Sequence, residues 1–506
     1  MKQRAALGFL LLFLVPAATR ADNLRLLDTT VFEYRGANRY SDPAVDEFGL
    51  GLNKLYLDGR MDDTTLGLQI DAAVFSNRPD APASPSAYRN DARLERITLA
   101  HTMGDAQFTL GDSHLQLGRG IALSLRRVDE LGSDQALRGG GMGWQGDVFS
   151  ARAFAGVTNL ANLDAVTQRH MRDPNDVLAG ASAIVHVGRA DVSVHGLYLR
   201  PNESQFPAIA DQDHTTLGGA YVDLPLTDWL SLYVEGAIEQ YRVIKSIDRG
   251  TAAYAAADVD LQFVSLLFEG LYLDKFEVMG SSDDLLNKRI AYNQPPTLER
   301  IDQEVLDNRD VRGGRVKLSR AFLDGSLVLY TSGMLRRFGL ENAAMNAVHG
   351  YGGFEYTYGG GRSRWYASAG YREERMADDG RLEKTMAHGE TDWVQSIGGP
   401  WALHLTVGHE QRTLGEHPYE RGTTLLGFDR AGWGSLMAEV GYDTQYKDRQ
   451  QLFLAGILAW TTADWMTVKA VVGSQRGGIK CIGGVCRDFP AFSGARLEAT
   501  MQYDVL

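Results

Sequence analysis

The chain has 506 residues, of which 51 are basic and 64 acidic, so its formal net charge is −13 at pH 7. This acidic balance argues against binding to nucleic acid or anionic lipid through bulk charge. Beyond the first residues the sequence has no apolar run long enough for a transmembrane helix, and its mean hydropathy is −0.23. A membrane protein built from strands has such a composition, because only alternate residues of each strand contact lipid, and so does an exported soluble protein.

A targeting segment is predicted at residues 1–21. Lys2 and Arg4 form a charged start, residues 5–15 are apolar, and small residues follow up to Ala21. This order is typical of a secretory signal peptide, and we expect cleavage after Ala21. As an uncleaved anchor the apolar stretch would be too short, since a helix that spans a bilayer needs roughly 20 residues. We expect residues 22–506 to form a single domain.

Alternation of apolar and polar residues predicts β-strands along the rest of the chain. Near the end of the sequence, Leu497, Ala499 and Met501 are apolar, and the residues between them are polar. Residues 66–74 and 230–238 repeat the pattern. Strands of about 9 to 12 residues match the tilted span of a bilayer core. The pattern therefore predicts strands with one face suited to lipid and the other to water.

The connections between these strands alternate in length. The short ones, rich in Gly, Asp, Pro and Thr, lie at residues 60–63, 103–105, 145–147, 187–189, 226–228, 258–260, 323–325, 359–361, 398–400, 429–432 and 461–464. Longer polar stretches lie between them, such as residues 77–90, 111–135, 158–176, 200–214 and 274–314. Short turns at one end and long loops at the other are typical of outer-membrane barrels. These connections predict an all-β fold, a single antiparallel up-and-down barrel of about 24 strands, with a range of about 18 to 26.

Tryptophan placement supports the same fold. Every tryptophan lies within several residues of a predicted short turn: Trp144, Trp229, Trp365, Trp393, Trp401, Trp433, Trp460 and Trp465. Because an indole ring prefers the headgroup level of a membrane, we expect these residues to form a periplasmic aromatic girdle. A soluble all-β repeat protein, the alternative fold, has no reason to sort tryptophan by turn length.

The two cysteines, Cys481 and Cys486, are close in sequence. After export they can be oxidised, which predicts a disulfide that closes a loop tip. Redox or metal chemistry is the alternative, although a metal site would need more ligands. If both termini are periplasmic, this tip and the long loops face outside.

Three segments have distinctive sequences. Residues 111–132 contain GDSHLQLGRGIAL followed by RRVDELG, residues 292–299 read YNQPPTLE, and residues 481–489 form the cysteine segment. These segments resemble an uncharacterised family, a domain of unknown function, of large bacterial outer-membrane β-barrel proteins. The resemblance implies a β-barrel and no known activity. The chain ends in Val505 and Leu506 rather than in the aromatic residue usual for such proteins, but recognition by the outer-membrane assembly machinery is still expected.

The long loop at residues 111–135 is the first candidate for a functional element. It is rich in glycine and carries Arg119, Arg126 and Arg127 among apolar residues. Arginines that line a pore constriction favour anions or carboxylated solutes, because rings of charge set pore selectivity. Alternatively, these arginines pair with acidic residues of the same loop and hold it against the barrel wall. The sequence does not decide whether this loop and the loop at residues 274–314 fold into the lumen.

Enzyme activity is not expected. Asp112, Ser113 and His114 have the residue types of a hydrolase triad. Adjacent side chains on a strand point to opposite faces, so these three cannot relay a proton together. No spacing typical of a metal or nucleotide site occurs, and we expect no catalytic residues, cofactor or metal.

Two functions remain open. Polar inner faces favour a porin-like channel for hydrophilic solutes or an exported product. A wide lumen with no plug domain before the first strand motivates the second, a scaffold or sheath that anchors or houses a partner envelope protein without transport. The expected location is the outer membrane of a Gram-negative bacterium. The expected partners are its lipid and lipopolysaccharide, the assembly machinery and, for a sheath, an envelope protein in the lumen, but no nucleic acid.

Overall fold

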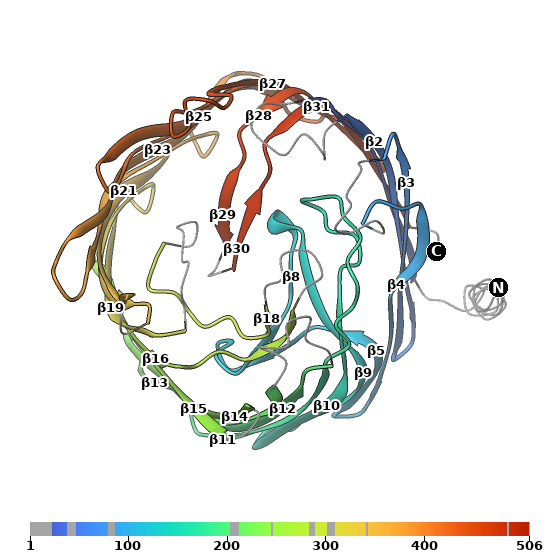
Figure 1. Ribbon diagram of the computed structural model, residues 1–506, viewed down its shortest axis with the longest axis vertical. Helices are drawn as coiled ribbons and strands as arrows, with labels where there is room; N and C mark the ends of the chain where they lie inside the picture. Colours follow the sequence, from blue (N-terminus) through green and yellow to red (C-terminus); the bar gives the residue numbers. More distant parts are fainter. Residues whose placement is uncertain are drawn as a thin grey trace.

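The computed structural model of this protein describes residues 23–37, 47–78, 87–202, 212–243, 246–282, 289–300, 309–340, 343–482 and 485–504. Within these ranges, 24 long strands form one closed antiparallel sheet, which Figure 1 shows end-on as a ring. The ring closes because the first strand pairs with the last, from Arg25 opposite Asp504 to Arg35 opposite Gly494. The predicted fold class and strand number are confirmed. The predicted signal peptide, residues 1–21, lies outside the described residues.

The strands of the barrel wall follow one another around the ring in chain order. They are β1 (Asn23–Arg35), β2 (Phe48–Met61), β3 (Thr64–Ser76), β4 (Asp91–Met103), β5 (Ala106–Ser113), β9 (Ser133–Gln145), β10 (Phe149–Leu160), β11 (Val177–Val187), β12 (Ala190–Arg200), β13 (Gln212–Thr227), β14 (Leu230–Val243), β15 (Ser246–Leu261), β16 (Val264–Asp274), β19 (Val311–Phe322), β20 (Leu327–Phe338), β21 (Met345–Tyr358), β22 (Ser363–Met376), β23 (Leu382–Gly398), β24 (Trp401–Leu414), β25 (His417–Arg430), β26 (Gly434–Asp443), β27 (Leu452–Ala463), β28 (Met466–Gln475) and β31 (Phe492–Asp504). In the part of the chain that is described, no helix is long and apolar enough to cross a membrane.

Alternate residues of each strand face opposite sides of the wall. In β14, Val234 and Ile238 point outward and are 54% and 56% exposed, whereas Glu235 and Glu239 point inward and are buried. This is the arrangement expected of a wall with lipid outside and polar groups inside. Because the sheet is closed, its backbone N–H and C=O groups find partners on neighbouring strands, as a bilayer requires.

The predicted short turns lie at one end of the barrel, and ten of the eleven are placed correctly within the described residues. The exception is the turn predicted at residues 258–260. Those residues belong to β15, with Asp260 opposite Ser265, and the chain turns later, at Gln262 and Phe263. Polar residues occur at positions 258 and 260 because Asp258 and Asp260 lie on the inward face of β15, not because the chain turns there.

The tryptophans lie at this short-turn end, as predicted. Six of the eight are between 39% and 49% exposed: Trp144, Trp229, Trp365, Trp401, Trp460 and Trp465. Half-exposed indole rings near the turns fit an aromatic girdle at a membrane surface.

The sequence pattern predicts an inner wall that is polar throughout, and the structure corrects this prediction. Toward the loop end, inward residues of β11, β12 and β16, such as Leu178, Leu199 and Leu271, are apolar and buried. They belong to a hydrophobic core that lies inside the barrel, because segments between strands fold into the lumen and pack against them. Figure 1 shows elements of these segments, labelled β8, β18, β29 and β30, inside the ring.

A closed barrel of this kind is expected to show heat-modifiable migration on a denaturing gel. Detergent does not open a sheet that has no free edge, so the unboiled protein should run at a different apparent mass from the boiled one. Migration that is the same with and without boiling would contradict a closed barrel.

Candidate functional site in the lumen

A segment that we call the first inward segment, residues 114–132, leaves the wall after β5 and returns at β9. It contains the hairpin β6 (Leu115–Leu117) and β7 (Leu123–Leu125), then β8 (Arg127–Val128) and the short 3-10 helix η2 (Asp129–Leu131). The hairpin is the apolar part: Ile121 and Leu123 are fully buried against the core inside the barrel. Each such side chain contributes about 1.5 to 3 kcal/mol by burial, so the segment is held firmly in the lumen.

Two glycines at the tip of this hairpin allow close approach, one to the wall and the other to Gln294, outside the hairpin. Gly118 has φ +54, and a Cβ there would lie 2.1 Å from a carboxylate oxygen of Glu235 on β14. Gly120 has φ +86, and its carbonyl accepts a hydrogen bond from the N–H of Gln294 at 2.8 Å. Only glycine fits both the backbone conformation and the space at these positions.

Arg119, between these glycines, is fixed against the wall. Its backbone N–H donates to Glu235 at 2.9 Å. Its guanidinium carbon lies 4.1 Å from the ring centre of Tyr233, and its Nη1 donates to the hydroxyl of Tyr254 at 3.3 Å. The side chain nevertheless remains exposed to the lumen. Arg119 therefore both holds the segment and presents positive charge.

The other two predicted arginines point to different places. Arg126 donates to the side-chain carbonyl of Gln294, and burial lowers the pKa of its guanidinium. Arg127 pairs with Asp129 and lies over the ring of Tyr56 on β2, at 5.5 Å. The structure thus brings Arg119 and Arg126 together and separates Arg127 from them.

Arg119 and Arg126 line one pocket of about 350 Å³ between the first inward segment and the wall. Gln116, Gln294 and Glu269 also line it, so guanidinium, amide and carboxylate groups all face the same space. A small hydrophilic solute would find both donors and acceptors there.

A second inward segment, residues 275–300, crosses the lumen beside the first. Its described parts include β17 (Met279–Ser282) and β18 (Arg289–Ala291). Carboxylates on or beside the wall strands accept hydrogen bonds from its backbone: Glu239 on β14 accepts from the N–H of Glu277 at 2.8 Å, and Asp176, just before β11, accepts from the N–H of Ser281 at 2.8 Å. Asp176 also accepts from the hydroxyl of Tyr292 at 2.7 Å. These bonds satisfy backbone groups that would otherwise be buried without partners.

Glu299, near the end of this segment, is attached to a different part of the wall. It accepts a hydrogen bond from Nδ1 of His349 on β21 at 2.8 Å and lies 3.3 Å from Arg372 on β22. Burial opposes its charge, but the His349 hydrogen bond and the Arg372 charge outweigh that effect and lower the pKa of the Glu299 carboxyl. The next residue, Arg300, donates to both carboxylate oxygens of Glu390 on β23 at 2.7 and 2.9 Å. The second segment therefore links walls on two sides of the lumen.

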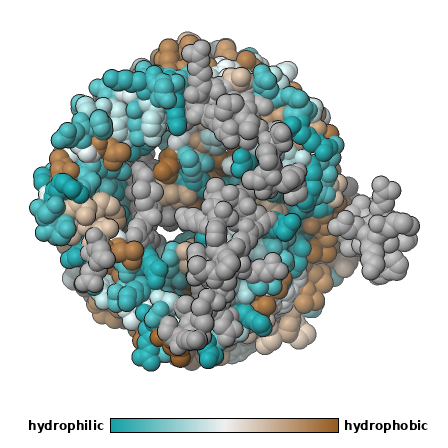
Figure 2. Space-filling view, in the orientation of Figure 1, coloured by the Kyte–Doolittle hydropathy of each residue, from teal (hydrophilic) through white to brown (hydrophobic). Residues whose placement is uncertain are grey.

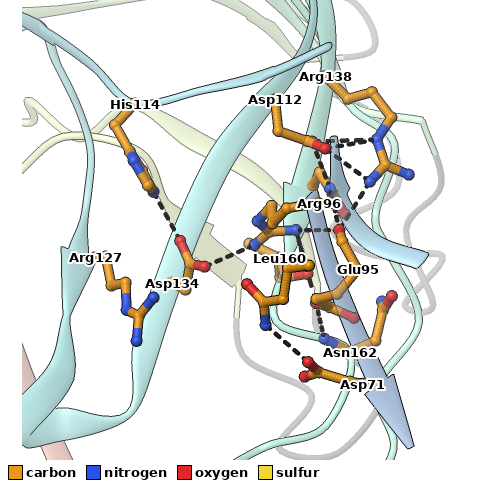
Figure 3. Close-up of polar contacts among 12 residues, drawn as sticks. Asp71, Glu95, Arg96, Asp112, His114, Arg127, Asp134, Arg138, Leu160 and Asn162 are labelled. Carbon is orange, nitrogen blue, oxygen red and sulfur yellow. Dashed lines mark hydrogen bonds and ion pairs between the residues drawn. The ribbon is translucent and has the colours of Figure 1, made fainter. Parts of the chain in front are cut away.

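A polar network, drawn in Figure 3, fixes the two ends of the first inward segment. Asp112, just before it, pairs with Arg138 on β9 at 2.9 Å. Asp134, just after it, pairs with Arg96 at 3.2 Å and with His114 at 2.8 Å. These contacts, rather than pairing among the arginines and acids of the loop alone, attach the loop to the wall.

This network depends on an irregularity in β4. Gln69 of β3 pairs with Arg96, but Ile70 pairs with Leu94, so Glu95 is an extra residue in β4. The bulge lets Glu95 and Arg96 both be buried, although they are adjacent. The oxygen Oε1 of Glu95 accepts the N–H of Asn162 at 2.9 Å, which joins a further loop to the same place (Figure 3).

The two cysteines form a disulfide within the hairpin of β29 (Gly478–Ile482) and β30 (Val485–Phe489). The hairpin lies inside the ring in Figure 1 rather than extending away from the barrel. Arg487 explains this, since it donates to the carbonyls of Leu131 and Gly132 at 3.0 Å and pairs with Asp164 at 2.6 Å. Figure 2 shows mainly hydrophilic residues around the rim of the ring.

Sequence reasoning selected the loop at residues 111–135 as a functional candidate, without deciding whether it folds inward, and missed the carboxylates that hold the segments in place. Glu235 and Glu239 on β14, Asp176 just before β11, and Glu299 in the second inward segment are all buried. A signal was present in the strand pattern, since Glu235 and Glu239 are acidic residues on an inward face beside small residues. Their partners are more than 35 positions away, and no local pattern identifies them. Among the described residues, no group of three or more His, Cys, Asp or Glu is arranged to hold a metal ion.

A model of a family of unknown function (DUF6029) matches residues 424–503, which is consistent with an uncharacterised outer-membrane barrel family. No curated protein matches the chain in sequence.

Solved structures of three outer-membrane barrels resemble the chain at low identity. The P pilus usher (PapC) translocation pore is 8% identical, with coverage of 96% of this chain and 100% of that one, and a TM-score of 0.46. The siderophore receptor PirA from Pseudomonas aeruginosa is 9% identical, with coverage of 95% and 80% and a TM-score of 0.47. The Pseudomonas aeruginosa protein OccK2 (OpdF), in complex with glucuronate, is 12% identical, with coverage of 71% and 94% and a TM-score of 0.40.

Proposed function

We propose that this protein is an outer-membrane channel that passes hydrophilic solutes or an exported product through a lumen narrowed by its own inward segments. The observation that carries the proposal is the closed wall of 24 strands among the described residues, which encloses charged side chains and a pocket. A wide barrel must be restricted if the membrane is not to leak, and here the chain supplies the restriction itself.

The scaffold or sheath has less support. A housed partner would need room in the lumen, but the two inward segments pack against the wall there, and the disulfide hairpin contacts the first of them. Single-channel recording in planar bilayers tests the proposal: discrete conductance steps are expected. An electrically silent protein that co-purifies with a stoichiometric envelope protein in mild detergent would favour the scaffold instead.

We further propose that Arg119 and Arg126 bias the channel toward anions. Both line the same pocket, whereas Arg127 lies beside Tyr56 and serves as a matched control. In the double variant Arg119→Gln, Arg126→Gln, the chloride-to-potassium permeability ratio is expected to fall by about twofold or more. Reversal potentials in a salt gradient measure this ratio, and Arg127→Gln should leave it near the wild-type value. An unchanged ratio in the double variant would assign these arginines a structural role only.

A further inference from the structure

A group of tyrosines on the inner wall is partly exposed to the lumen, with Arg300 of the second inward segment beside one of them. Tyr330 on β20, Tyr351 on β21 and Tyr366 on β22 face the lumen and are partly exposed. By contrast, Tyr233 and Tyr254, which lie under Arg119, are 5% and 2% exposed. We call Tyr330, Tyr351 and Tyr366 the aromatic shelf.

Two rings of the shelf are nearly parallel, and the third meets one of them edge-on, with 69° between their planes. The rings of Tyr330 and Tyr366 are the nearly parallel pair, with 13° between their planes and 6.4 Å between their centres. The ring centre of Tyr351 is also 6.4 Å from that of Tyr330. Gly353, on β21 between them, makes this possible, because a Cβ there would lie 2.7 Å from the Tyr330 hydroxyl. Because Gly353 has no side chain, Tyr330 can extend over it toward Tyr366.

Polar groups of several kinds surround the shelf. Tyr366 donates its hydroxyl hydrogen to Glu390, which also binds Arg300. The guanidinium carbon of Arg300 lies 5.8 Å from the ring centre of Tyr351. The ammonium of Lys317 lies 6.0 Å from the ring centre of Tyr330, is exposed, and forms no ion pair with any described residue. The rim therefore offers hydrogen-bond donors and acceptors together with one available positive charge.

We propose that the aromatic shelf binds a saccharide that carries a carboxylate, and this inference rests on the proposed channel function. One face of a pyranose ring is made of C–H groups and packs on an aromatic ring, while its hydroxyls need polar partners at the rim. A partly exposed aromatic surface in a wetted lumen has an unfavourable contact with water that such a ligand removes. Lys317 supplies the partner for the carboxylate.

Two probes of similar size test the proposal: trigalacturonate, which is acidic, and maltotriose, which is neutral. Both are titrated against the channel current, and contact with the protein in detergent is measured independently by saturation-transfer NMR. Trigalacturonate is expected to bind about fivefold more tightly than maltotriose. The double variant Tyr330→Ala, Tyr366→Ala should weaken both by about tenfold or more, and Lys317→Gln should remove only the preference for the acidic sugar. Tyr371→Ala is the matched control, because Tyr371 is 50% exposed on β22 but opposite Ala387, on the outward face.

The two measurements separate the shelf from the channel. If the protein shows current steps but neither sugar blocks the current or gives an NMR signal of contact, the proposed sugar site is wrong and the channel proposal is supported. NMR contact that depends on Tyr330 and Tyr366 in an electrically silent protein would support the shelf and overturn the channel. Equal binding of both sugars by the wild-type protein would overturn the role of Lys317 and hence the acidic class of ligand.

Discussion

A Glu299→Gln variant is expected to lose the attachment of the second inward segment to β21 and β22. Its single-channel current should be larger and noisier than that of the wild type. The Glu299 side chain is fully buried. Its negative charge balances that of Arg372, and it accepts a hydrogen bond from His349. Removing one partner of a buried ion pair costs about 3 to 5 kcal/mol, because the other charge stays buried without its counter-charge. Few contacts hold this end of the segment, so a loss of this size should be enough to detach it from β21 and β22.

The attachment through Glu299 should also make the single-channel current of the wild type depend on pH. The folded protein holds the pKa of Glu299 below its ordinary value of 4.5, so the stabilisation is fully present above that pH. It is lost as the pH falls through the lower native pKa. The wild-type current should therefore be the same at neutral and mildly acidic pH and rise only below about 4.5. The Glu299→Gln variant should lack this acid response.

Glu373→Gln is the matched control for Glu299→Gln. Glu373 lies on β22 next to Arg372, but it pairs with Arg375, and both side chains are partly exposed. Such a pair contributes about 0 to 1 kcal/mol, so the current should not change. Hydrogen exchange of residues 289–300 gives a second measurement. Equal exchange rates in Glu299→Gln and the wild type would show that Glu299 does not hold the segment.

A Gly118→Val variant is expected to displace the tip of the first inward segment from the wall and to increase conductance. The new Cβ would lie 2.1 Å from an oxygen of Glu235, in a backbone conformation that a β-branched residue rarely adopts. Glu235 cannot move without losing its hydrogen bonds with Tyr233 and the N–H of Arg119. The conformational strain and the lost buried hydrogen bonds together cost about 2 to 5 kcal/mol.

Gly188→Val separates the effect of displacement from that of backbone strain. Gly188 has φ +63 in the turn between β11 and β12, and no atom lies within 4 Å of a Cβ built there. This variant bears the strain of a positive φ but meets no neighbour, so its current should match the wild type. Both variants should keep heat-modifiable migration, which shows an intact barrel. A Gly118→Val channel with wild-type conductance would mean that the hairpin tip does not restrict the lumen.

The sequence by itself determined the wall of this protein. Alternation in segments such as residues 230–238 and the spacing of turns such as 359–361 are local properties, because a strand repeats every two residues and a turn needs only a few. They were enough to predict strand number, the lipid-facing side and the tryptophan positions. The turn predicted at residues 258–260 was wrong. Asp258 and Asp260 face the lumen, and a local pattern does not distinguish polar residues on an inward face from polar residues in a turn.

Only the tertiary structure decided what fills the lumen. Whether residues 114–132 fold inward depends on Glu235 and on the apolar inner wall that receives Leu123, and these lie far away in sequence. The contact of Arg487 with Asp164 spans 323 positions, and it turns the disulfide hairpin inward rather than away from the barrel. Contacts between distant residues set the free energy of these segments, whereas local propensity sets that of a strand or a turn. For that reason the barrel could be predicted from its sequence, and the arrangement of its lumen could not.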